Sequence, residues 1–357
     1  MVAPLTLSQR VVLVAAVGLS IVAGAAQAFV TSEVARFLLA GAALAALAAL
    51  VGAAIEQVGE RLGPGPTGLL QSALGNLPEL FVGIFALRNG LTGVVQAALV
   101  GSVLSNTLLV LGVAFLAGGL RHGPQRFPPE APRMIATLLV LAVGALLVPT
   151  LAVRLQTPAS HHAGTLSNIC AGVLLVVYLL SIPFWLRGGP SASPERVEPT
   201  GDAVAWPLPL AVTLLATGSL LAALVSDWFV GALEPATHSL GISQTFTGLV
   251  IVAIASNAVE NAVGIRFALK ARPDFAISTI LNSPLQIALL LTPALVLLSR
   301  VVGPTQLTLV FPPLLIVALA VAAIVVVIVV YDGEYTWLEG VALLGLYFIV
   351  AAAFWWG

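Results

Sequence analysis

The chain has 357 residues, of which 59% are hydrophobic and 8% are charged, and its formal net charge is −1. A soluble domain carries about 25% charged residues, so this composition excludes an ordinary soluble protein and indicates an integral membrane protein made of helices. The near-neutral charge argues against nucleic-acid binding. The single cysteine, Cys170, excludes an internal disulfide and a cysteine cage for a metal.

Apolar runs of about 20 residues recur along the chain, and that length spans a hydrocarbon core about 30 Å thick. The first run contains a pattern like a signal-peptide cleavage site at Ala26–Ala28. Because the run is longer than the usual hydrophobic region of about 7–15 residues, we expect an uncleaved helix. We expect eleven transmembrane helices, at about 10–30, 35–58, 67–89, 92–118, 133–153, 163–186, 206–230, 243–269, 274–300, 306–330 and 337–356.

A linker rich in glycine, proline and serine divides the chain. We assign 1–33 to an N-terminal helix, 34–187 to a first five-helix half, 188–204 to the linker and 205–357 to a second five-helix half. Because five is odd, the second half must cross the membrane in the opposite sense, which is the inverted-repeat plan of secondary transporters. The expected fold class is an all-α integral membrane protein with one N-terminal helix and two inverted repeats.

The basic residues are distributed unevenly over the predicted topology, which puts the N-terminus in the cytoplasm and the C-terminus outside. The short N-terminal segment leaves little room for a regulatory domain, so we expect the plasma (inner) membrane of a prokaryotic type rather than an organelle. One side carries Arg10, Arg61, Arg121, Arg126, Arg133, Arg187, Arg196, Arg266, Lys270 and Arg272, and the other carries Arg36, Arg88, Arg154 and Arg300.

Two short motifs of the form Asn-x-x-Glu organise the chain: Asn76 with Glu79, and Asn257 with Glu260. A carboxylate at membrane depth costs about 2.5–3.5 kcal/mol on insertion scales, so it faces a partner, a cavity or an ion path rather than lipid. Neither glutamate has a Lys or Arg within one helical turn in the sequence. Two such carboxylates in matching settings predict one shared site.

The match between the halves extends beyond these motifs. Ser102 and Ser283 follow their glutamates at the same distance in the sequence (102 − 79 equals 283 − 260). The tripeptide Thr-Gly-Leu occurs at Thr67–Leu69 and again at Thr247–Leu249. We interpret these matches as an internal repeat with a period of 181 (260 − 79), in which Glu260 is the counterpart of Glu79.

The motif residues suit a hard cation. Positions i and i+3 share a helix face, so each half offers a carboxylate beside an amide oxygen, and Ca²⁺ takes about 6–8 oxygen ligands. Two carboxylates neutralise one divalent ion; without it they repel each other in a poorly solvated place and favour protonation. This predicts exchange of a divalent cation for protons at Glu79, Glu260, Asn76 and Asn257.

We expect further oxygen ligands from the backbone and from neighbouring helices. Pro78 cannot donate to the carbonyl of Leu74, and that carbonyl and the one of Ala255 are candidate metal ligands. Polar side chains on the next helix of each half are candidates for the transport path, or alternatively bond neighbouring helices as in many bundles. They are Ser102, Ser105, Asn106, Ser283 and Gln286.

Four other positions are candidates for a gate or an access path. Glu56 and Glu234 are expected at corresponding helix ends, where an interfacial role is the alternative. Pro78 and Asn261 flank the two motifs.

The sequence resembles the calcium/proton exchanger family, the cation/proton antiporters, within the cation/calcium exchanger superfamily. The resemblance covers nearly all of 37–356, and its carrying stretches include Gly75–Glu79, Val95–Asn106, Ser256–Glu260 and Asp332–Gly340. It implies eleven helices, the two glutamates as the cation and proton site, and efflux or sequestration of Ca²⁺ driven by a proton gradient. We expect Ca²⁺ as the transported substrate and no cofactor.

The chain departs from this family at its motifs. The first motif of the family usually reads Gly-Asn-Ala-Thr-Glu, whereas Leu77 and Pro78 stand here, and a proline before the glutamate is typical of the sister sodium/calcium exchangers. The second usually reads Gly-Asn-Ala-Ala-Glu-His, whereas Ser256 and Asn261 replace the glycine and the histidine. Losing that histidine removes a titratable neighbour and puts proton coupling, or its pH dependence, in question.

The expected function is therefore exchange of Ca²⁺ for H⁺ by alternating access. A Na⁺-driven Ca²⁺ exchanger of the same fold is the first alternative, and a cation channel is a remote one. An enzyme is not expected, because the sequence has no nucleophile–base pair, phosphate loop or metal cage. Stoichiometry, selectivity among Ca²⁺, Mn²⁺ and Cd²⁺, and assembly into a homo-oligomer stay open.

Overall fold

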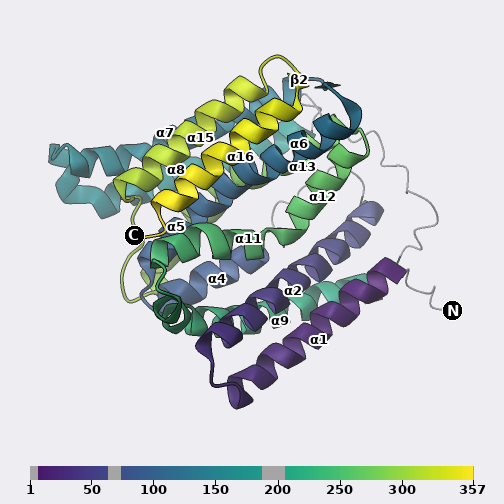
Figure 1. Ribbon diagram of the computed structural model, residues 1–357. Coiled ribbons are helices and arrows are strands. Elements are labelled where there is room, and N and C mark those ends of the chain that lie inside the picture. Colours follow the sequence, from purple (N-terminus) through teal and green to yellow (C-terminus); the bar gives the residue numbers. More distant parts are fainter. Residues whose placement is uncertain (1–6, 63–73, 187–205, 357) are drawn as a thin grey trace. The chain divides into compact units, whose positions relative to one another are not determined.

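The computed structural model describes residues 7–62, 74–186 and 206–356, which are almost entirely helical (Figure 1). They divide into two compact units. Unit 1 takes its described residues from Met1–Phe85, Ser193–Ile242 and Ala255–Val259, and unit 2 takes them from Ala86–Ala192, Ser243–Ile254 and Glu260–Gly357.

Unit 1 is built on three long helices that lie side by side (Figure 1): α1 (Leu7–Phe29), α2 (Glu33–Leu62) and α9 (Leu208–Leu240). Helices α2 and α9 pack closely where α2 has a glycine. The ring of Phe229 lies over Gly41, which has no side chain, and stacks on the ring of Phe37 with the ring centroids 4.6 Å apart.

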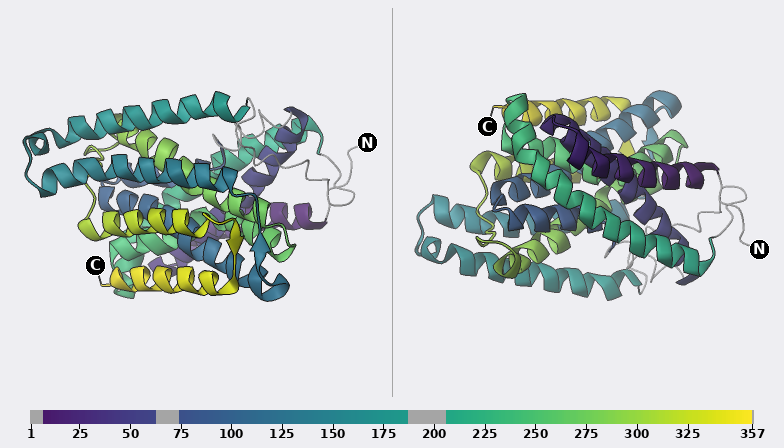
Figure 2. Two further views of the ribbon diagram at one scale, coloured as in Figure 1. Left: turned by 90° about the horizontal axis from the view of Figure 1, so that it is seen from above. Right: turned by 90° about the horizontal axis from the view of Figure 1, so that it is seen from below.

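Unit 2 contains the remaining long helices and a short two-stranded sheet, in which β1 (Gln125–Arg126) pairs antiparallel with β2 (Glu334–Tyr335). Figure 2 shows α7 and α8 as a pair joined at one end by the turn η2 (Pro158–His162). The helices of this unit include α5 (Thr92–Leu104), the π-helical segment η1 (Ser105–Val110), α6 (Leu111–His122), α7 (Glu130–Arg154), α8 (Ala163–Leu186), α13 (Pro273–Gln286), the π-helical segment η4 (Ile287–Leu291), α14 (Thr292–Val302), α15 (Pro313–Val329) and α16 (Trp337–Ala353).

Helical structure is interrupted at both Asn-x-x-Glu motifs. Gly75 and Asn76 form a turn immediately before α4 (Leu77–Arg88). In the second half, α10 (Gln244–Phe246), the π-helical segment η3 (Thr247–Val252) and α11 (Ala253–Ser256) lead to a turn at Asn257, after which α12 (Ala258–Leu269) begins. The two interruptions therefore fall at corresponding positions of the proposed repeat.

The helix predicted at 67–89 is wrong as one unbroken element, because Gly75 and Asn76 form a turn; its part 67–73 lies outside the described residues. The long helix predicted at 243–269 is wrong in the same way. Its parts 244–256 and 261–269 are bent by 63° relative to each other. By contrast, α5, η1 and α6 form one continuous span, as do α13, η4 and α14. The π-helical segments in these two spans begin at Ser105 and Ile287. The two starts are 182 positions apart (287 − 105), one more than the repeat period of 181. Short π-helical segments inside longer helices are frequent at functional sites.

Many helices have the length and composition to cross a membrane. Seven described helices qualify, or eight if the bent pair counts as one span, and α15 and α16 are apolar helices of 17 residues each. The prediction of a helical, multi-span membrane protein is confirmed at this level. The count of eleven and the inverted repeats stay predictions.

Two predicted helix boundaries are wrong. The helix predicted at 306–330 begins only at Pro313, because the preceding Pro312 has an extended conformation (φ −51°, ψ 137°), as expected for a residue followed by proline. The helix predicted at 206–230 continues to Leu240 and ends at Gly241, whose φ of +64° provides a left-handed cap.

The extended segment 303–312 is held by side chains of neighbouring helices. Gln96 Nε2 donates to the carbonyls of Thr308 (2.8 Å) and Val310 (3.0 Å). Thr150 Oγ1 donates to the carbonyl of Leu309 and accepts from the amide of Phe311, each at 3.0 Å. Non-helical backbone within a membrane protein needs such internal partners, since lipid offers none.

Helix α5 and segment η3 approach each other closely within unit 2. A Cβ atom at Gly101 would overlap the carbonyl oxygen of Leu249, and one at Gly248 would lie 2.8 Å from the carbonyl oxygen of Val94. Small residues at crossing points allow this contact in membrane proteins. The crossing fixes the position of Ser102, the next residue after Gly101.

Candidate functional site

The carboxylate of Glu79 lies in a buried polar cluster of unit 1. Glu79 is in the first turn of α4 and is 8% exposed, where the positive end of the helix dipole favours a negative charge. Its Oε1 accepts hydrogen bonds from Nδ2 of Asn257 (2.5 Å) and from Oγ of Ser256 (3.2 Å). Hydrogen bonds to an ionised group offset part of the cost of burying it.

The two donors come from the turn that separates α11 from α12. Ser256 is 8% exposed and Asn257 is 2% exposed. Asn257 Nδ2 also lies 3.4 Å from Ser256 Oγ. Together with Glu79, these two side chains form a closed triangle of polar contacts between residues of the two motifs.

Asn76 lies in the turn before α4, three positions before Glu79. It is buried, and its backbone carbonyl accepts from the amide of Leu80 at 2.9 Å, which starts α4. The donors described at Oε1 of Glu79 come from the second motif. The structure thus adds a contact between the halves to the expected neighbourhood within each half. A role for Asn76 as a ligand stays a prediction.

Leu74 and Ala255 stand just before the two turns, and cation binding by their carbonyls stays a prediction. Pro78 is buried in the first turn of α4. The N–H groups of a first turn have no acceptor within the helix, so the missing N–H of a proline costs the helix no hydrogen bond there. The interruption of the helix precedes it, at Gly75 and Asn76.

The structure leaves the second carboxylate of the predicted pair untested. Glu260 lies in α12, but its side chain is outside the described part of the chain. The same holds for the side chain of Glu56 in α2. Glu234 was predicted at a helix end, which is wrong: it lies within α9, well before the last residue Leu240, and is exposed.

A second polar cluster lies in unit 2, on the π-interrupted helices. Asn106 Nδ2 donates to the carbonyl of Ser102 (2.9 Å) and to Oγ of Ser283 (3.4 Å). Ser105 is fully buried, and its hydroxyl has no hydrogen-bond partner among the described residues. Gln286, which is partly buried, follows Ser283 by one helical turn. The structure therefore brings Asn106 and Ser283 together from two helices, and the carbonyl of Ser102 joins them. Whether these residues line the transport path or only bond the helices stays a prediction.

The sequence interpretation missed Ser256 as a residue of the first cluster. The signal was present, because Ser256 occupies the position of Gly75 one repeat period later (75 + 181). Asn261 lies in α12, partly buried, and its Oδ1 has no hydrogen-bond partner within the described residues.

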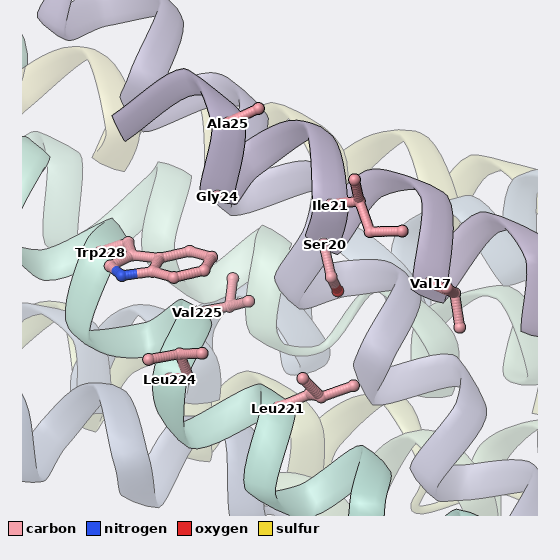
Figure 3. Close-up of a pocket in the computed structure, with 9 residues that line it drawn as sticks. All are labelled: Val17, Ser20, Ile21, Gly24, Ala25, Leu221, Leu224, Val225 and Trp228. Atoms are coloured by element: carbon pink, nitrogen blue, oxygen red, sulfur yellow. The ribbon is translucent and has the colours of Figure 1, made fainter. Parts of the chain in front are cut away.

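A separate apolar cavity of about 390 Å³ lies between α1 and α9 in unit 1 (Figure 3). The indole of Trp228 forms one wall, and its Cη2 lies 3.0 Å from where a Cβ of Gly24 would be. Ser20 directs its hydroxyl to the carbonyl of Ala16 in its own helix. The described residues that line it carry no titratable side chain, so they offer a cation no charged ligand.

Comparison with known proteins agrees with the resemblance. The family model described as sodium/calcium exchanger protein matches residues 32–186 and 210–356. A Ca²⁺/H⁺ antiporter of Synechocystis sp. is 38% identical over 340 residues, covering 90% of this chain and 91% of the relative. A vacuolar calcium ion transporter of Schizosaccharomyces pombe is 34% identical and covers 89% of this chain and 78% of its own.

A solved structure agrees as well. The structure of native YfkE superposes with a TM-score of 0.81 at 30% identity, covering 97% of this chain and 99% of that one. Sequence and fold thus match over nearly the whole length. The chain belongs to the sodium/calcium exchanger protein family.

Proposed function

We propose that this protein is a secondary antiporter that exchanges Ca²⁺ for H⁺ across a membrane by alternating access, with Glu79 and Glu260 as the shared cation and proton site. The Synechocystis relative carries the name Ca²⁺/H⁺ antiporter, which supports the choice of ions. In this proposal Ca²⁺ is the substrate and no cofactor takes part.

The observation that carries the proposal is the setting of Glu79. Its carboxylate is buried, and its Oε1 accepts hydrogen bonds from a neutral amide and a neutral hydroxyl. These two donors do not cancel the negative charge of the carboxylate, whereas a cation or a proton can. A carboxylate held in this way can alternate between a cation-bound and a protonated state, which is the chemistry of exchange.

We further propose that Asn76, Asn257, Ser102, Asn106, Ser283 and Gln286 line the cation and proton path, with backbone oxygens of Leu74 and Ala255 as ligands. The contacts of Asn257 with Glu79 and of Asn106 with Ser283 support this choice, since each joins residues of the two halves. Glu56, Pro78, Glu234 and Asn261 are proposed for the gate or the access path.

The proposed architecture has eleven transmembrane helices, in an N-terminal helix (1–33) and two inverted repeats (34–187 and 205–357) joined by the linker 188–204. Two features support the repeats. The turn asparagines Asn76 and Asn257 are separated in the sequence by the same interval as the two glutamates, because each precedes its glutamate by three positions. The first residues of the two π-helical segments, Ser105 and Ile287, are separated by this interval plus one position.

We propose that the protein resides in the plasma membrane of a prokaryotic type. The distribution of basic residues supports an N-terminus in the cytoplasm and a C-terminus outside. The yeast relative is named as vacuolar, so localisation of a tagged protein is the test. A signal confined to an internal organelle would contradict this placement.

The competing function is exchange driven by Na⁺, which the proline before Glu79 favours. The test is uptake of radioactive Ca²⁺ into proteoliposomes under either a pH gradient without Na⁺ or a Na⁺ gradient without a pH gradient. The proposal predicts uptake in the first condition. Uptake only in the second condition would assign the Na⁺-driven function. Single-channel currents in planar bilayers would instead indicate a channel.

A further inference from the structure

We propose that Ser256 is a positioning residue that gives the two oxygens of the Glu79 carboxylate different tasks, an inference that rests on the proposed exchange function. Position 256 corresponds to Gly75 in the first half (256 − 181), which has no side chain. The hydroxyl is therefore a feature of one half only, and it makes the polar cluster asymmetric.

The hydrogen bonds assign a direction to this hydroxyl. A serine has one hydrogen to donate and two lone pairs to accept with, whereas an amide nitrogen only donates. Asn257 Nδ2 donates to Oε1 of Glu79 at 2.5 Å and lies 3.4 Å from Oγ of Ser256, also as the donor. Ser256 thus accepts from Asn257 and donates its own hydrogen to Oε1 of Glu79, at 3.2 Å.

Two hydrogens therefore point at the same oxygen of Glu79. A proton on Oε1 would face an N–H group that cannot accept it, whereas Oε1 without a proton satisfies both donors. Oε1 is thus the anchored acceptor, and the exchanged proton binds Oε2. Ser256 favours the ionised carboxylate and fixes its orientation, and the ionised carboxylate is the form that binds a cation.

The test compares Ser256→Ala, Ser256→Gly and Ser256→Thr in proteoliposomes under one fixed pH gradient. Loss of the hydroxyl removes a hydrogen bond to a charged group, so we expect KM for Ca²⁺ to rise about tenfold in the alanine and glycine variants. Vmax per protein molecule should stay close to that of the parent. Threonine keeps a hydroxyl and should restore the KM.

The matched control is Ser226→Ala, which removes a fully buried hydroxyl of unit 1 that has no hydrogen-bond partner among the described residues. It should leave KM unchanged. If the threonine variant does not fold, the inference is tested by measuring how the thermal stability of the purified parent and of Ser256→Ala rises with Ca²⁺ concentration. We expect the alanine variant to need about tenfold more Ca²⁺ for the same protection.

The inference is overturned if KM and the protective Ca²⁺ concentration are those of the parent in both hydroxyl-free variants, or if Vmax falls with KM constant. Those outcomes leave Ca²⁺/H⁺ exchange by the parent intact. Failure of the proposed function has a different signature, because the parent itself would then take up no Ca²⁺ under a pH gradient.

Discussion

The side-chain amide of Asn257 donates to Oε1 of Glu79 at 2.5 Å, although 178 residues separate the two in the chain. The bond joins the asparagine of one motif to the glutamate of the other. It therefore gives a structural reason why the motif occurs twice: each copy supplies part of the surroundings of a single buried charge.

The first prediction concerns this amide. Asn257→Ala should raise KM for Ca²⁺ by about tenfold or more, since a hydrogen bond to a charged group is worth about 1.5–3 kcal/mol. Asn76→Ala should also weaken apparent affinity, because an amide three positions before Glu79 can contribute one oxygen to the cation. The measurement is initial Ca²⁺ flux against Ca²⁺ concentration.

Asn168→Ala is the control, because Asn168 bonds Gln306 and Gly164 in unit 2, apart from both motifs. Parental affinity in both motif variants would make these asparagines helix-packing residues rather than members of the site.

Part of this arrangement can be predicted from the sequence, because the repeat of Asn-x-x-Glu with a fixed period depends on local residue order alone. The motif also predicts a buried charge, since its surroundings are apolar. The contact between Asn257 and Glu79 could not be predicted, because the spacing of i and i+3 pairs Glu79 with Asn76 of its own motif. Only the fold, which turns the chain at Asn257, reveals the partner.

The same limit applies to the fold. Apolar length predicts the long helices well, as for α8, whose observed bounds Ala163–Leu186 equal the predicted ones. It fails at 306–312, where an apolar segment is extended because Gln96 and Thr150 supply hydrogen bonds to its backbone. Hydropathy does not register partners that are so distant in the chain.

The second prediction tests that extended segment. Thr150→Val keeps the shape of the side chain but leaves a buried amide and carbonyl without their partner, at a cost of about 1–3 kcal/mol. We expect a lower temperature of aggregation in detergent, measured by fluorescence-detected size-exclusion chromatography. Thr217→Val is the control, because its hydroxyl is exposed and bonds a carbonyl of its own helix. Equal temperatures for both variants would contradict the structural role.

The third prediction concerns the crossing of α5 with η3. Gly101→Ala would place a methyl group against the carbonyl oxygen of Leu249 with no room for it, so the helices must separate, at a cost of at least about 1–3 kcal/mol. We expect loss of thermal stability and of transport. Gly93→Ala in the same helix meets no atom within 4 Å and should fold like the parent. A stable, fully active Gly101→Ala variant would refute the crossing.

The fourth prediction concerns the pH dependence. Asn261 is next to Glu260 and cannot change its charge, whereas a histidine titrates near neutral pH. Asn261→His should therefore carry a positive charge at acidic pH and repel a cation, and be neutral at alkaline pH. We expect Ca²⁺ flux of the variant to fall more steeply on acidification than that of the parent, at a constant pH gradient. Superimposable curves would place position 261 outside the coupling machinery.

The central claim is tested most directly by measuring Ca²⁺ uptake and H⁺ release together in sealed, Na⁺-free proteoliposomes. The account predicts that Ca²⁺ added outside drives H⁺ out of the parent's vesicles, and that Glu79→Gln and Glu260→Gln abolish both fluxes while they insert and fold normally. Glu130→Gln, at an exposed carboxylate in the first turn of α7, should exchange like the parent. Coupled fluxes at parental rates in either Glu79→Gln or Glu260→Gln would contradict the account.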